Sequence, residues 1–145
     1  MGMVKTRLLC CIAFLLCVPV AWAGEQLVLV TASTSPLHDI DSLELRKIYL
    51  GFTIIHDDNI IKGLRNTEDE DINHIFLQTV VAMSEKSYMR RQLSLTLRKG
   101  IQRPLEYDRL DDLVKALSRN PYSVSYMWKD AAEREPRVQI LRVLW

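Results

Sequence analysis

The sequence predicts a single α/β domain in which a small, largely parallel sheet is flanked by about four helices. Two observations support this class. Short aliphatic runs such as Leu27–Thr31 alternate along the chain with longer amphipathic segments such as Asp41–Phe52. In addition, no repeat, low-complexity tract or linker interrupts residues 24–145. Strands that alternate with helices favour a parallel sheet with helices packed on its faces.

The first 23 residues have the pattern of a secretory signal peptide. Lys5 and Arg7 precede an apolar run, Leu8–Val20, and Ala21-Trp22-Ala23 offers a cleavage site. The run is shorter than the about 20 residues that a membrane span needs. We therefore expect cleavage of residues 1–23, a periplasmic domain over 24–145 and no membrane span after cleavage. The alternative is an uncleaved membrane anchor.

Composition excludes several classes of function. All three cysteines lie within the signal peptide, so disulfides, thiol catalysis and cysteine-bound metals are not expected. Two of the 19 basic residues and none of the 18 acidic ones lie there, which leaves a net charge near −1. A near-neutral domain has no electrostatic basis for binding nucleic acid. The three histidines stand 18 residues apart, without metal-ligand spacing, and no cofactor motif or nucleophile–base signature occurs. We expect no enzyme, no metal and no cofactor.

The first half of the domain begins with a buried strand and a well-specified helix. Leu27–Thr31 leads into the polar turn Ala32–Pro36. Asp41 is placed to cap the following helix and Gly51 to end it in a left-handed conformation. Four apolar residues at helical spacing predict its buried face: Leu45, Ile48, Tyr49 and Phe52.

The remaining elements are bounded by turn and capping residues. A short strand is expected over 60–64, and Thr67 with Glu70 forms a capping box for a second helix. Ser84 and Asp108 are the expected caps of a third and a fourth helix. The alternating pattern of residues 123–128 and the run 138–144 predict the last two strands.

Four segments, taken in order, resemble the phosphate-binding proteins of ABC importers, and especially their short, single-domain exported relatives. Ser42–Gly51, SLELRKIYLG, resembles a helix of that family, and Arg65 matches an arginine that follows its second strand. Leu113–Tyr126, LVKALSRNPYSVSY, is similar to a later helix–strand segment. The remaining segment lies between Arg65 and Leu113 and matches at Phe76, Val80, Val81, Met83 and Ser84. The resemblance implies a type 2 periplasmic-binding-protein fold, of which this chain has the length of one lobe.

The resemblance also implies where an oxyanion such as phosphate would bind. Family members hold it at helix starts and strand-end loops, the usual ligand position in open α/β sheets. The candidate ligand-binding residues are Ser33, Thr34, Ser35, Arg65, Asn66 and Thr67. The family's Ser-Gly-Thr is replaced here by Asn66–Asp71, NTEDED, whose carboxylates would repel an anion.

Two functions follow from this comparison. The first is an exported solute-binding protein, related to phosphate importers, that binds a small oxyanion. The second is a non-transport interaction module of an envelope or surface assembly, which keeps the lobe, has lost anion binding and contacts an envelope protein. The acidic helix start, the length of one lobe and the aromatic residues near the C-terminus favour the second.

Overall fold

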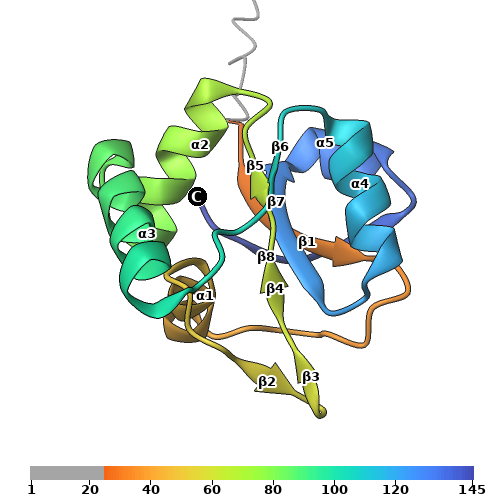
Figure 1. Cartoon of the computed structure of the whole chain (residues 1–145). Helices are drawn as coiled ribbons and strands as arrows, with labels where there is room; N and C mark the ends of the chain where they lie inside the picture. The colour runs from red at the N-terminus through yellow and green to blue at the C-terminus, as the bar shows by residue number, and fades with distance from the viewer. Residues whose placement is uncertain (1–24) are drawn as a thin grey trace, which may run out of the picture.

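A computed structural model describes residues 25–145, so the predicted signal peptide lies outside the described residues. A four-stranded sheet stands at the centre, with helices on both faces (Figure 1). Its strand order is β4–β7–β1–β8. These strands span Lys62–Gly63 (β4), Ser123–Trp128 (β7), Leu27–Ala32 (β1) and Val138–Val143 (β8).

The strand directions differ from the prediction. Strand β1 runs antiparallel to both of its neighbours, with Leu29 opposite Tyr126 of β7, and within this four-stranded sheet only β4 and β7 are parallel. The α/β class is therefore confirmed, but the prediction of a largely parallel sheet was wrong. A continuous apolar run shows only that both faces of a strand are buried. Here both faces of an antiparallel strand are covered by helices, so its sequence looks like that of a parallel strand.

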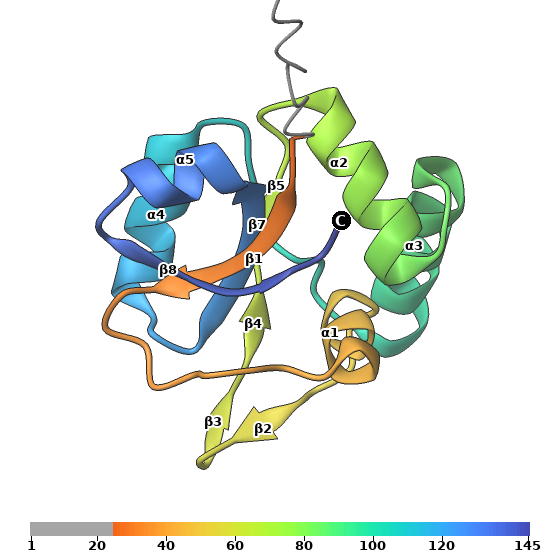
Figure 2. The ribbon, with the colours of Figure 1, turned by 180° about the vertical axis from the view of Figure 1, so that it is seen from behind.

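Alternate residues of β1 enter two separate cores. Leu27 and Leu29 pack on one face, whereas Val28 and Val30 pack on the other. The first core lies under α1 (Ser42–Tyr49), α2 (Glu70–Phe76), the π-helix η1 (Leu77–Val81) and α3 (Glu85–Lys99). The second lies under α4 (Leu110–Arg119) and α5 (Lys129–Arg134). Figure 2 shows the two helix groups on opposite sides of the sheet.

Helix α1 has the predicted start and stop. The Asp41 carboxylate accepts a hydrogen bond from the Leu43 N–H at 3.0 Å, and Gly51 has φ of 89°. Tyr49 is fully buried, and its hydroxyl donates to the Leu64 carbonyl at 2.9 Å. Phe52 was expected on the same buried face but is 54% exposed, because it lies beyond Gly51, where the chain leaves the helical path.

Other helix boundaries test the capping predictions. Ser84 caps α3 as predicted, and its hydroxyl accepts from the Ser87 N–H at 3.2 Å. Helix α2, however, is capped by Asp69, not by Thr67, and α4 follows Arg109 without a side-chain cap. The charged stretch after Trp128 forms the additional helix α5. Residues 25–145 therefore contain five α-helices, one more than expected.

Two short ribbons complete the domain. Strands β2 (Ile55–His56) and β3 (Asn59–Ile60) form a hairpin that projects beyond the sheet and leads into β4 (Figure 1). Its turn residues Asp57 and Asp58 have φ of 48° and 61°, as the tight hairpin turn requires. Strands β5 (Arg65–Asn66) and β6 (Glu106–Tyr107) pair in parallel, which places Arg65 beside Glu106.

Candidate functional site

The six predicted ligand residues form two groups at opposite ends of the sheet. Ser33–Ser35 follow β1, whose residue Thr31 lies opposite Val124 near the start of β7. Arg65–Thr67 lie near the other end of β7, where the Asn66 side-chain amide donates to the Tyr126 carbonyl at 3.0 Å. The site prediction assumed that both strand ends meet at one edge, which holds for parallel strands only. Because β1 is antiparallel to β7, the structure does not bring the two groups together.

In the first group, only two side chains face solvent. Ser33 and Thr34 are exposed in the turn after β1. Ser35 is buried; its hydroxyl donates to the Pro121 carbonyl and accepts from the Leu37 N–H at 3.2 Å. The Ser35 hydroxyl therefore stabilises the loop itself.

In the second group, Arg65 is buried with only 2% of its surface exposed. Its guanidinium donates to the carboxylate of Glu106 and to the side-chain oxygen of Asn73. It also lies 5.0 Å from the centre of the Tyr88 ring, within the range of a cation–π interaction. Asn73 in turn donates to Glu85 at 3.1 Å. The positive charge expected to bind an anion is thus already paired inside the protein.

Aromatic side chains surround this arginine and lower the local dielectric. Phe76 and Tyr126 stack with ring centres 3.6 Å apart, and Tyr49 meets Phe76 edge-on at 4.6 Å. Burial raises the pKa of Tyr88 to about 12, although the nearby Arg65 opposes that rise. Burial likewise raises the pKa of Tyr49 and Tyr126. All three phenols are therefore neutral at physiological pH, and the pairing of Arg65 is strengthened by its apolar surroundings.

Asn66 and Thr67 also make internal contacts. The Asn66 side chain is fully buried and accepts from the Glu68 N–H at 3.0 Å, in addition to its bond to β7. The Thr67 N–H donates to the Tyr107 carbonyl at 2.9 Å. Both residues therefore hold β5 between β7 and β6.

The start of α2, next to these residues, is acidic. The carboxylate of Asp69 accepts from the Asp71 N–H at 2.8 Å and from the indole N–H of Trp128 at 3.3 Å. Glu70 and Asp71 occupy the first turn. Carboxylates of the protein thus already lie at the positive end of the helix dipole, where an anion would bind.

The network around Arg65 includes three residues that sequence reasoning missed: Asn73, Tyr88 and Glu106. Glu106 is 41 residues from Arg65 along the chain. It lies in a strand of two residues, too short for any recognisable pattern. No local signal in the sequence could have paired the two.

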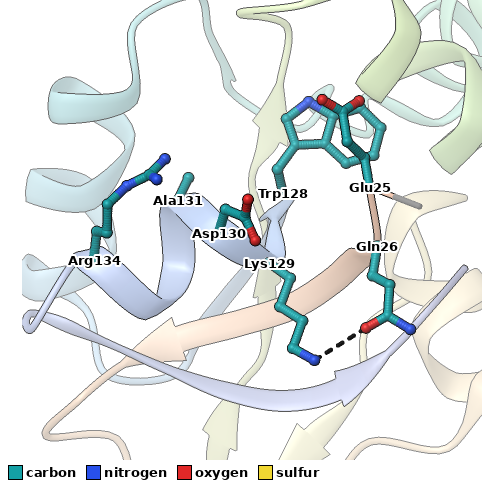
Figure 3. A pocket seen from close by; sticks show the side chains of 7 residues that line it. All are labelled: Glu25, Gln26, Trp128, Lys129, Asp130, Ala131 and Arg134. Carbon is teal, nitrogen blue, oxygen red and sulfur yellow. Dashed lines mark hydrogen bonds between the residues drawn. The ribbon is translucent and has the colours of Figure 1, made fainter. Parts of the chain in front are cut away.

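A pocket of about 150 Å³ lies elsewhere, between the residues preceding β1 and the first turn of α5 (Figure 3). Lys129 donates to the side-chain oxygen of Gln26 at 3.1 Å across it. Its seven lining residues are Glu25, Gln26, Trp128, Lys129, Asp130, Ala131 and Arg134. They include two acids and two cations and none of the six candidate residues, so this pocket has no excess positive charge to attract an anion.

Comparison with known proteins gives a structural likeness only. No family model and no curated protein matches the chain. An ABC-type phosphate transport receptor from Vibrio cholerae superimposes with a TM-score of 0.59 at 12% identity, over 81% of this chain and 46% of the receptor. PstS from Borrelia burgdorferi gives 0.58 at 14% identity, over 81% of this chain and 46% of PstS.

A third solved structure is a Clostridium perfringens protein described as a phosphate ABC transporter substrate-binding protein, with bound phosphate. It gives a TM-score of 0.57 at 13% identity, over 81% of this chain and 44% of that protein. The likeness shows the fold. The chain spans less than half the length of these neighbours, which are transport receptors and binding proteins. No helix within residues 25–145 is long and apolar enough to cross a membrane.

Proposed function

We propose that this chain is an exported, one-lobe relative of the substrate-binding proteins of phosphate importers, and that it contacts an envelope protein instead of enclosing phosphate. The observation that carries the proposal is the pairing of Arg65 with Glu106 and Asn73. The structural neighbours support the ancestry, and the signal-peptide pattern supports a periplasmic location.

Phosphate at Arg65 would displace hydrogen bonds that the folded protein already makes. Each hydrogen bond from a charged group contributes about 1.5–3 kcal/mol, and a phosphate bound by Nη1 and Nη2 of Arg65 would have to replace two of them. The Nε atom of Arg65 has no hydrogen-bond partner among the described residues, but it is buried. It would also meet the carboxylate of Glu106 and the acidic first turn of α2. Two like charges about 4 Å apart repel by about 4 kcal/mol at an effective dielectric constant near 20. Tight binding of a dianion at Arg65 is therefore disfavoured.

Isothermal titration of the purified protein with phosphate, and separately with sulfate, tests the proposal. We expect no saturable heat at millimolar concentrations of either anion. Saturable binding of phosphate with a micromolar dissociation constant would contradict it. The Glu106→Gln variant serves as a control, since it removes the competing charge and keeps a side-chain oxygen for Arg65.

A second candidate function is binding of a small oxyanion at Arg65. It is favoured by one observation: the Clostridium perfringens neighbour contains bound phosphate. In this case Glu106, whose side chain is 49% exposed, would turn into solvent and leave the guanidinium to the anion. The same titration separates the two functions, because only the second predicts phosphate binding that is lost in Arg65→Met.

A further inference from the structure

A groove of about 270 Å³ lies against β4. It shares no lining residue with the pocket of Figure 3. We call it the β4 groove. Phe52 and Ile60 line one part of it, and Ile101 and Leu105 of the connector between α3 and β6 line another. Phe52, Ile60 and Leu105 are 54%, 53% and 63% exposed. Large apolar side chains gathered at such exposure are typical of an interaction site.

Strand β4 is an edge strand of the sheet, and its residues line this groove. On the side away from β7, the Ile61 N–H donates to Ile54 and the Arg65 N–H donates to Leu105, at 2.9 Å and 2.8 Å. Gly63 lies between them, in the edge strand of the four-stranded sheet. The bonds from Lys62 and Leu64 to β7 direct the N–H and carbonyl of Gly63 toward the groove. An extended chain could bond to them, as in recognition by strand addition.

The charge of the groove is of one sign. Lys62 and Arg103 line it and are exposed, and no acidic residue is among its lining residues. Within residues 25–145 neither cation takes part in an ion pair. A ligand that complements this surface carries apolar side chains for the walls and carboxylates for the rim.

We propose that the β4 groove binds an extended segment of a partner protein in which apolar residues are flanked by aspartate or glutamate. This inference rests on the proposed function and identifies the surface through which it is exercised. The segment pairs with the Gly63 backbone, packs its apolar side chains against Phe52 and Leu105, and places its carboxylates near Lys62 and Arg103. At about 270 Å³ the groove is slightly below the about 300–1,000 Å³ of sites that enclose a drug-sized ligand, so it holds part of such a segment.

The test is selection of a display library of random peptides on the purified protein. The same selection is run on Lys62→Glu/Arg103→Glu and on the control Lys86→Glu/Arg119→Glu. The control changes the net charge equally, at exposed residues outside the groove. We expect enrichment of apolar peptides rich in Asp and Glu on the wild type and the control, and its loss on the groove variant. An enriched peptide should bind the groove variant roughly tenfold more weakly, as expected for two partly exposed charge pairs.

The site of binding is read from backbone amide chemical shifts in the presence of that peptide. Shifts that centre on Gly63 support the proposal. Enrichment without acidic preference, equal enrichment on the groove variant, or shifts centred elsewhere would overturn it. Self-association that the groove variant abolishes would also overturn it, since the occupant would then be a second copy. The phosphate titration is independent, so a failed selection with no phosphate binding refutes the groove and leaves the proposed function standing.

Discussion

The Arg65→Met variant tests whether Arg65 stabilises the fold or serves to bind a ligand. The substitution removes the hydrogen bonds to Glu106 and Asn73 and the contact with the Tyr88 ring. It keeps an unbranched apolar chain in the same space, so the cavity it leaves is small. Glu106 is half exposed and can return to water, whereas the buried side-chain oxygen of Asn73 loses its donor.

The size of the effect follows from these contacts. Breaking a buried ion pair by removing one partner costs about 3–5 kcal/mol. The exposure of Glu106 places this pair at the lower end, so we expect Arg65→Met to lower the free energy of unfolding by about 3 kcal/mol. For a domain of this size the corresponding fall in Tm is roughly 10 °C. An arginine kept for ligand binding would give little or no loss of stability in the absence of ligand.

Urea unfolding followed by tryptophan fluorescence measures the difference. The matched control is Arg119→Met, an exposed arginine at the end of α4, for which we expect a change within about 0.5 kcal/mol. An Arg65→Met variant as stable as the control would refute the structural role. Stabilisation by phosphate of the wild type but not of Arg65→Met would also refute it. A ligand present at 100 times its Kd raises the free energy of unfolding by about 2.7 kcal/mol.

Three further changes test other parts of the fold. Gly63→Ala should lower the free energy of unfolding by about 1–3 kcal/mol, because its Cβ would lie 2.9 Å from the Tyr49 ring; an unchanged urea midpoint would contradict the packing of α1 on β4. Ser84→Ala should cost about 1 kcal/mol through loss of the α3 N-cap, measured in the same way. Arg137 lowers the pKa of Glu135, so this carboxylate stabilises the fold above its unfolded pKa and the contribution is lost as pH falls through the lower folded value. Melting curves of Arg137→Gln at acid and neutral pH should therefore show a smaller loss of Tm on acidification than the wild type, and parallel curves would count against the pairing.

Helix α1 and the start of α3 were predictable because their signals are local. Asp41 and Ser84 each lie within three residues of the N–H group that they accept from, so a short window of sequence contains both partners. The start of α2 was misplaced because local sequence offers two caps and does not distinguish between them. Thr67 and Asp69 are both good caps, and they differ in their tertiary contacts. The Thr67 N–H donates to the Tyr107 carbonyl, whereas the Asp69 carboxylate accepts from Trp128.

The candidate site could not be predicted, because it depends on strand direction and on distant pairs. Helices cover both faces of β1, so its sequence does not distinguish a parallel from an antiparallel strand. This error placed Ser33 and Thr34 beside Arg65, whereas the sheet separates them. The pairing of Arg65 with Glu106 depends on the parallel contact of two short strands, β5 and β6, which leave no pattern in the sequence.

The most direct test of the central claim is a crystal structure of the protein grown in millimolar phosphate. We expect Arg65 to remain bonded to Glu106 and Asn73, with no tetrahedral anion within hydrogen-bond distance of its guanidinium. A phosphate held by Arg65 and Thr67, with Glu106 turned into solvent, would contradict it.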